Sequence, residues 1–234
     1  MISNWPQLIL FGDSHFQFCF GTPGSFGSRL ADKLQRRCDV LNRGFSGYNT
    51  VLAKQLLPEI FQGESLRDVV GVVILFGTND AALEEPHQRS QRVSLEDYAQ
   101  NLADIIAHFV ANGVPKERII LVSPPPADDV AWEMNQRLRN EHSPRSNAEI
   151  EKYAQVVYEV ARIHGTLFGN LHESILNSSD KWQVNYADGL HFNDAGSAVF
   201  FELLSPIVDR MLRAYPARYP LWTEIDFSNP SIKQ

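Results

Sequence analysis

Residues 8–18 read LILFGDSHFQF, an apolar run that ends at Gly12 and is followed directly by Asp13, Ser14 and His15. A short apolar run that a glycine terminates is typical of a buried strand. With this first strand at 7–12, similar runs follow at 39–43, 69–77, 118–123 and 165–170. Segments of helical periodicity separate them, as in parallel strands joined by crossover helices. The sequence therefore predicts the α/β class: a three-layer α/β/α sandwich around a five-stranded parallel sheet.

Two of the helices have clear ends in the sequence, at 94–112 and 146–164. Each begins with a serine followed three residues later by an acidic residue, as in a capping box, and each is followed by a glycine. A third helix runs from about 194 to 214 and contains Pro206. Because proline removes a backbone donor inside a helix, we expect two helical pieces there.

Composition favours one globular domain over residues 1–234. The chain has 234 residues, of which 44% are hydrophobic, and its formal net charge is −7 with dispersed basic residues. Nucleic-acid-binding proteins usually carry clustered basic residues, which this sequence lacks, so we expect no nucleic acid partner. The longest apolar run, 69–77, is far shorter than the roughly 20 residues of a membrane-spanning helix, and only a few residues precede the first strand. We therefore expect no membrane insertion and a cytoplasmic location.

The segment 215–234 has prolines and aromatic residues but no periodicity. We interpret it as a C-terminal tail packed on the domain. A contact in a homodimer and a lid over a pocket are the alternatives.

The carboxyl ends of parallel strands meet at one edge of a sheet, which is where ligands bind in such folds. Ser14 follows the first strand, but the side chains of Asp13 and His15 beside it diverge from that of Ser14. A base must reach a serine hydroxyl at about 2.6–3.2 Å, so the base for Ser14 lies elsewhere in the chain. On its own, Gly-Asp-Ser is also a common turn sequence.

Candidate partners for Ser14 occur in YADGLHFNDAG at 186–196. Asp188 lies three residues before His191, so it could accept the Nδ1 proton of that histidine and leave Nε2 free as a base. The alternative is a turn that enters a helix and carries a solvated histidine. Asn79 and Gly47 follow two other strands and could supply a side-chain and a backbone N–H to a developing oxyanion, or could simply form turns.

Together these stretches resemble the four signature blocks of the GDSL, or SGNH, hydrolases: FGDS, RGFSGYNT, FGTNDA and DGLHF, in the family's order. The resemblance implies the flavodoxin-like fold of that family. It also implies Ser14 as nucleophile and oxyanion donor, Gly47 and Asn79 as further oxyanion donors, His191 as base and Asp188 as its orienting acid. Gly44 is the alternative to Gly47.

More narrowly, RGFSGYNT, GTNDA, the triple proline at 124–126 and VSLEDYAQNLADII are similar to the branch of isoamyl acetate-hydrolysing esterases. That resemblance implies hydrolysis of short-chain esters, a small-molecule ester as partner, and no metal or organic cofactor. One departure is His15, because the family commonly has Leu or Ile there. We expect a substrate pocket walled by the loops after strands three and four, with His15, Phe16, Pro125 and Trp132 as its candidate residues.

Other readings of the same residues remain. The same fold and chemistry could serve a deacetylase of acetylated sugars, a lysophospholipase or a thioesterase, or the chain could be a non-catalytic binding module. A metal site built from Asp188, His191 and Asp194, with Asp13 as a further ligand, is the least favoured alternative, because a catalytic metal usually takes more than one imidazole ligand.

Overall fold

Five parallel strands form one sheet in the order β2-β1-β3-β4-β5. The computed structural model describes residues 5–22, 24–61, 66–84 and 91–228. The strands are β1 Gln7–Gly12, β2 Asp39–Gly44, β3 Val69–Leu75, β4 Ile119–Val122 and β5 Leu167–Gly169. This is the flavodoxin-like strand order, in which β2 lies on one side of β1 and the later strands are added on the other side. The predicted five-stranded parallel sheet is confirmed.

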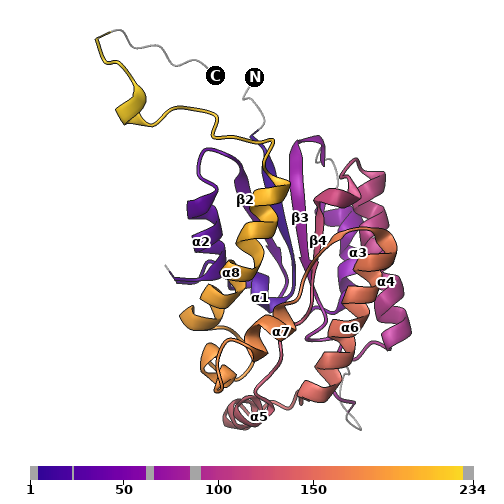
Figure 1. Ribbon diagram of the computed structural model, residues 1–234. Coiled ribbons are helices and arrows are strands. Elements are labelled where there is room, and N and C mark those ends of the chain that lie inside the picture. The colour runs from indigo at the N-terminus through magenta and orange to yellow at the C-terminus, as the bar shows by residue number, and fades with distance from the viewer. Residues whose placement is uncertain (1–4, 23, 62–65, 85–90, 229–234) are drawn as a thin grey trace.

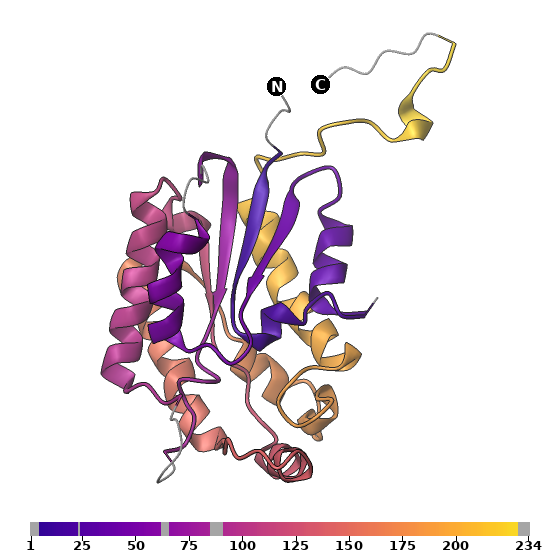
Figure 2. The same cartoon turned by 180° about the vertical axis from the view of Figure 1, so that it is seen from behind.

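Helices cover both faces of the sheet (Figures 1 and 2). One face carries α2 Phe26–Lys33, α7 Leu171–Leu176 and α8 Asp194–Met211, and the other carries α3 Thr50–Ile60, α4 Leu95–Ala111 and α6 Asn147–His164. Two further helices, α1 Ser14–Gln17 and α5 Asp129–Leu138, lie at the carboxyl end of the strands. Short 3₁₀ turns occupy Leu66–Asp68, Lys116–Arg118, Trp182–Asn185 and Trp222–Glu224. The three layers expected from the sequence are therefore present.

The alternation of side chains along β1 explains why both faces are covered. Leu8 and Leu10 pack into the core on the side of α2 and α8, whereas Ile9 and Phe11 pack into the core on the side of α3, α4 and α6. A strand that is buried on both faces reads as a continuous apolar run, which is why the sequence signal was strong. Each such side chain stabilises the fold by about 1.5–3 kcal/mol when fully buried.

The helix ends differ in one respect from expectation. At the start of α4, Ser94 Oγ accepts a hydrogen bond from the backbone N–H of Asp97 at 3.0 Å, as predicted. At the start of α6, the Ser146 side chain makes no capping bond to the described residues, and Glu149 instead accepts hydrogen bonds from Arg92 and Lys152. Gly165 ends α6 with a φ of 69°, a left-handed conformation that favours glycine.

The break expected at Pro206 is wrong, because α8 runs from Asp194 to Met211 as one helix. Phe200, Leu204 and Val208 lie buried along one face of α8 on both sides of the proline. Pro206 itself is exposed, as is Glu202, the residue whose carbonyl loses its donor. Water can hydrate that carbonyl, so packing on the buried face outweighs the missing hydrogen bond.

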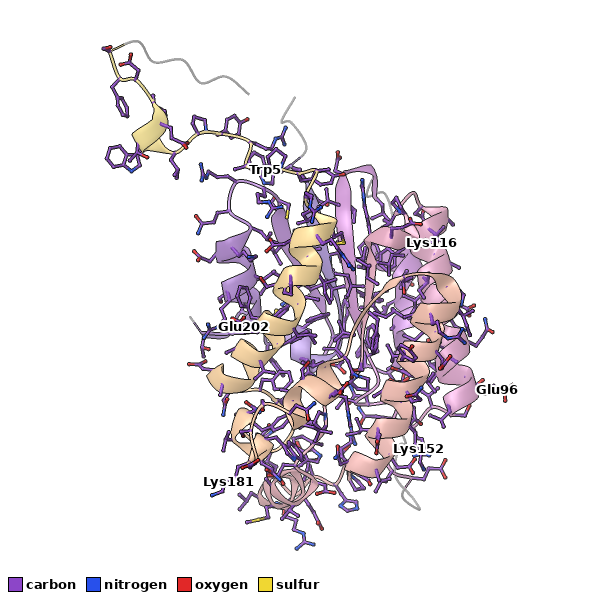
Figure 3. All side chains as sticks on the ribbon, viewed as in Figure 1. Trp5, Glu96, Lys116, Lys152, Lys181 and Glu202 are labelled. Atoms are coloured by element: carbon purple, nitrogen blue, oxygen red, sulfur yellow. The ribbon has the colours of Figure 1, made fainter. Side chains whose placement is uncertain are left out.

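Residues 215–219 lie against the end of the sheet opposite α1. Tyr219 stacks on Trp5 with ring centroids 5.9 Å apart, and the carbonyls of Tyr215 and Tyr219 accept hydrogen bonds from Arg37 and Arg36. Beyond them, residues 220–228 run away from the domain, with Trp222 72% exposed (Figure 1). Figure 3 labels Trp5 at this end of the molecule and Lys181 at the opposite end. Within the described residues, no helix has the length and apolarity needed to cross a bilayer.

Candidate active site

Ser14 stands where β1 turns into α1, at the carboxyl edge of the sheet. Asp13 caps this helix: its Oδ1 accepts the backbone N–H of His15, and its own N–H donates to the Leu75 carbonyl at the end of β3. Because Ser14 is the first residue of the helix, its backbone N–H has no acceptor within the helix. The turn therefore presents both the hydroxyl and a free N–H of the same residue.

The structure brings His191 and Asp188 to Ser14, 177 and 174 residues along the chain. His191 Nε2 lies 3.0 Å from Ser14 Oγ, and His191 Nδ1 lies 2.8 Å from Asp188 Oδ2. The other oxygen, Asp188 Oδ1, accepts the backbone N–H groups of Leu190 and His191 at 3.0 and 2.7 Å. One carboxylate thus folds the turn and orients the imidazole at the same time.

The protonation of this pair follows from its surroundings. Burial raises the pKa of Asp188, but hydrogen bonds from the side chain and backbone of His191 outweigh that effect and bring the pKa to about 2. An ionised Asp188 can only accept, so His191 Nδ1 carries a proton and donates it to the carboxylate. In the neutral imidazole, Nε2 then has its lone pair directed at Ser14 Oγ, as a general base requires.

Packing around His191 restricts the ring further. The rings of Phe18 and Trp132 make T-shaped contacts with it, with centroids 5.6 and 5.8 Å away. Gly189 has a φ of +94°, and a Cβ there would lie 2.4 Å from the backbone nitrogen of Trp132. The turn therefore needs glycine to approach α5, where the Asp128 N–H donates to the Gly189 carbonyl at 2.9 Å.

Asn79 and Gly47 lie in the loops after β3 and β2, at the same edge of the sheet as Ser14. Asn79 Nδ2 donates one hydrogen to the Tyr48 carbonyl at 2.9 Å, which leaves its second hydrogen for another acceptor. Gly47 has a φ of +80°. The alternative residue, Gly44, already donates its N–H to Asn42 Oδ1 at 2.8 Å, and a Cβ on it would lie 2.0 Å from the Gln17 nitrogen. Close approach to α1 therefore explains Gly44, and Gly47 remains the better candidate for an oxyanion donor.

Asp80, next to Asn79, joins these two loops. Its Oδ1 accepts the backbone N–H of Thr50 at the start of α3 at 2.9 Å, together with the Thr50 hydroxyl. Burial raises the pKa of Asp80 to about 7, although the bonds from Thr50 oppose the rise. The carboxyl thus anchors the loop that carries Gly47 to the strand end that carries Asn79.

Arg145 is a buried residue of this region that the sequence reasoning missed. Its Nη2 donates to Asn79 Oδ1 at 3.1 Å and to Gln91 Oε1 at 2.9 Å. Gln91 in turn donates through Nε2 to the Gly47 carbonyl at 2.7 Å. No local pattern marked Arg145, because its contacts join four segments that are distant in the sequence.

His15 is buried beside the catalytic turn. Its Nδ1 lies 3.0 Å from Asp13 Oδ1, and its Nε2 lies 3.1 Å from the carbonyl oxygen of Leu190. Burial lowers the pKa of His15, but the Asp13 carboxylate and the Leu190 carbonyl outweigh it and the net shift is upward. Since a carbonyl only accepts, Nε2 must donate to it, and His15 links the serine turn to the histidine turn.

A cavity of about 700 Å³ opens beside Ser14 and His191, between residues 18–22 and 25–26 on one side and the start of α8 on the other. Its walls include Phe18, Phe26 and Phe192. Thr22 and Asp194 also line it, and Thr22 Oγ1 donates to Asp194 Oδ1 at 3.1 Å. Gly47 and Asn79 are not among its described lining residues, so the cavity lies on the histidine side of Ser14.

The four expected pocket residues fall in different places. His15 lines the cavity. Phe16 instead packs against both Phe26 and Phe200 in the core, because α1 turns it toward the sheet. Pro125 is buried after β4, and Trp132 contacts His191 rather than the cavity. Of the loop after β3 expected to wall the pocket, residues 85–90 lie outside the described residues.

The residues weighed as metal ligands are engaged otherwise. Asp188 orients His191, Asp13 bonds to His15, and Asp194 accepts the Thr22 hydroxyl. In the described part of the chain, no three His, Cys, Asp or Glu side chains gather as a metal site would require.

Comparison with known proteins identifies the family. Residues 10–199 match the model of the GDSL-like lipase/acylhydrolase family. The chain belongs to that family. Relatives include the isoamyl acetate-hydrolyzing esterase 1 homologs of Mus musculus and Homo sapiens, which are 38% and 37% identical over 97% of this chain and 91% of theirs. A GDSL esterase/lipase of Arabidopsis thaliana is 34% identical over 97% of this chain and 96% of its own.

Solved structures of other hydrolases share the fold. A lipase/acylhydrolase from Enterococcus faecalis superposes with a TM-score of 0.67 at 23% identity, covering 91% of this chain and 98% of that one. A catalytic mutant of an acetylxylan esterase from Geobacillus stearothermophilus gives a TM-score of 0.64 at 20% identity, with 88% and 94% covered. With the family match and the named esterase relatives, the chain is a serine hydrolase of the GDSL type that acts on esters.

Proposed function

We propose that this GDSL hydrolase cleaves short-chain, acetate-type esters through an acyl-enzyme on Ser14. The observation that carries the proposal is the continuous chain from Ser14 Oγ through His191 to Asp188, with distances of 3.0 and 2.8 Å. Asn79 and Gly47 supply the oxyanion donors on the neighbouring loops.

The reaction then proceeds in two balanced halves. Ser14 Oγ attacks the ester carbonyl carbon while His191 Nε2 takes the hydroxyl proton, and the resulting oxyanion accepts hydrogen bonds from Ser14 N–H, Gly47 N–H and Asn79 Nδ2. As the carbon–oxygen bond to the alcohol breaks, His191 returns its proton to the leaving oxygen. Water repeats the cycle on the acyl-serine and releases the acid.

The position of the cavity supports a division of the substrate. His191 must protonate the leaving alcohol, and the cavity of about 700 Å³ lies on the His191 side of Ser14. The alcohol part of the ester therefore fits this cavity, whose phenylalanine walls favour an apolar alcohol. The names of the mammalian relatives, which specify isoamyl acetate, support the same combination of a small acyl group with an apolar alcohol.

A p-nitrophenyl ester series from acetate upward, with isoamyl acetate beside it, tests the proposal. We expect the highest kcat/KM on acetate, and no hydrolysis above background for Ser14→Ala. Ser205→Ala, a buried serine of α8 outside the cavity, is the matched control and should keep wild-type activity. Undiminished hydrolysis by Ser14→Ala would refute the acyl-enzyme. A preference for long acyl chains, acyl thioesters or acetylated sugars would replace the proposed activity by that of a lysophospholipase, a thioesterase or a deacetylase, respectively.

Asn79→Ala tests the oxyanion hole. Loss of one donor lowers kcat by about 10²–10³-fold, because the hydrogen bond forms in the transition state. We expect KM and the melting temperature to change little. Near-normal turnover in this variant would remove Asn79 from the oxyanion hole.

Two other expectations from the sequence stay predictions. A cytoplasmic location can be tested by fractionation of the source cells. A homodimer can be tested by sedimentation velocity of the purified chain.

A further inference from the structure

We propose that Arg145 is a positioning residue that holds the two loop-borne oxyanion donors, Asn79 and Gly47, in their working orientation. The inference rests on the proposed function, since it assigns these two residues to the oxyanion hole. It adds the loop between α5 and α6 to the three segments, at Ser14, Gly47 and Asn79, that supply the oxyanion donors.

The Arg145 guanidinium lies at the centre of a network of acceptors. Nη1 donates to the Ser143 carbonyl, the Ser143 hydroxyl and the Pro144 carbonyl at 3.0, 2.8 and 3.2 Å. Nη2 donates to Asn79 Oδ1 and Gln91 Oε1. The residue is only 6% exposed, and no carboxylate of the described residues bonds to it directly. Nη1 therefore fixes the guanidinium to its own loop, and Nη2 faces the oxyanion loops.

The contact with Asn79 decides which way its amide points. Nδ2 donates to the Tyr48 carbonyl, and Oδ1 accepts from Arg145, so both ends of the amide are matched to their partners. A flipped amide would face Arg145 with its N–H groups and Tyr48 with its oxygen, which leaves two donors together and two acceptors together. Arg145 thus keeps the spare Nδ2 hydrogen available to the oxyanion.

The contact also changes the amide electronically. A cation at Oδ1 draws electron density from the amide, which makes the Nδ2 hydrogens stronger donors, as in charge-assisted and cooperative hydrogen bonds. Burial lowers the pKa of Arg145 to about 10, with Asp13 and Asp80 opposing the shift, so the guanidinium stays protonated at neutral pH. A fixed positive charge near the developing oxyanion costs no reorganisation during the reaction.

Gly47 is reached through Gln91. Arg145 holds Gln91 Oε1 at 2.9 Å, and this orients Gln91 Nε2 toward the Gly47 carbonyl at 2.7 Å. Fixing the carbonyl of Gly47 restrains the loop around its N–H. The same guanidinium nitrogen therefore bonds to Asn79 and, through one intervening amide, restrains Gly47.

The test is a double-mutant cycle between Arg145→Gln and Asn79→Ala, read as kcat and KM on p-nitrophenyl acetate. We expect Arg145→Gln alone to lower kcat by about 10–100-fold with KM within about threefold, since the loss falls on the transition state. In the Asn79→Ala background the same change should cost less than about fivefold, because part of its target is gone. Arg145→Lys should recover only part of kcat, because a single ammonium cannot reproduce the planar fork.

Arg37→Gln is the matched control. Arg37 also bonds to backbone carbonyls, those of Tyr215 and Leu212, but at the opposite end of the sheet. The Arg37→Gln substitution should lower the melting temperature without changing kcat. Full additivity of Arg145→Gln with Asn79→Ala would overturn the proposal, as would a loss of stability with unchanged kcat, and Arg145 would then only support its own loop.

Failure of this inference and failure of the proposed function give different results. If Ser14→Ala retains wild-type activity, the acyl-enzyme is refuted, whatever Arg145 does. If Ser14→Ala is inactive while Arg145→Gln turns over normally, only the Arg145 proposal fails. A readout independent of turnover is the side-chain ¹⁵N–¹H resonance of Asn79, which we expect to shift in Arg145→Gln and to stay in place in Arg37→Gln; an unchanged resonance in Arg145→Gln overturns the positioning role.

Discussion

Two aspartate–histidine pairs lie side by side in this molecule, and only one of them reaches the Ser14 hydroxyl. His15 Nδ1 meets Asp13 at 3.0 Å and His191 Nδ1 meets Asp188 at 2.8 Å, with the two imidazole centroids 5.9 Å apart. The side chains of the first pair are fully buried, whereas the His191 side chain is 25% exposed. The pairs share residue types and geometry at Nδ1, so their roles are decided elsewhere.

The partner of Nε2 makes the difference. His191 Nε2 faces Ser14 Oγ, a hydroxyl that can give up a proton, whereas His15 Nε2 faces the Leu190 carbonyl, which can only accept. The lone pair needed for proton transfer is therefore available at His191 and is replaced by an N–H at His15. An acid next to a histidine does not by itself make a catalytic base.

The largest expected effect separates the two histidines in activity. His191→Ala removes the base and lowers kcat by about 10⁴-fold or more. His15→Leu, which restores the residue type common in the family, should keep kcat within about tenfold because it removes only a link between two turns. Steady-state kinetics on p-nitrophenyl acetate give both numbers. Comparable losses in the two variants would contradict the division of roles.

The Asp13–His15 pair, in contrast, should matter for the stability of the fold. His15→Leu leaves the Asp13 carboxylate buried without its cation, and we expect the free energy of unfolding in urea to fall by about 3 kcal/mol. The double variant Asp13→Asn/His15→Leu should be more stable than His15→Leu alone, because the buried charge is gone. If the double variant is less stable still, the pair does not act as a unit.

The pH dependence of stability gives the smallest and sharpest contrast. The pKa of His15 is raised above 6.5 in the fold, so its stabilising contribution is complete below pH 6.5 and is lost as the pH rises through the folded-state value. The pKa of Asp188 is lowered from 3.8 to about 2, so its contribution is complete above pH 3.8 and is lost as the pH falls toward 2.

Urea unfolding across this range tests both signs. The difference between wild type and His15→Leu should shrink above pH 6.5, and the difference between wild type and Asp188→Asn should shrink between about pH 4 and 2. If the difference in unfolding free energy between wild type and His15→Leu stays constant up to pH 10, the buried imidazole is neutral in the fold.

The sequence predicts the features that rest on local pattern. All five strands follow from apolar runs and from the residues that end them. Of Ser14, Asp188 and His191, which the family resemblance singled out, His191 lies within hydrogen-bonding distance of both others in the structure. Pro206 was misread because its cost depends on which face of α8 it occupies. Phe16 was misplaced because a pocket wall and a core wall look alike in a sequence. Arg145 had no local signal, since its proposed role comes from its bonds to Asn79 and Gln91 and, through Gln91, from the link to Gly47.

Trp5 and residues 215–219 meet at the end of the sheet opposite Ser14, where Figure 3 labels Trp5. A peptide tag, a fluorescent domain or a surface tether attached beyond either segment would thus emerge from the far side of the molecule. An immobilised enzyme of this kind would present its cavity to the solution, and neither the attachment nor its linker would obstruct the entry of an ester.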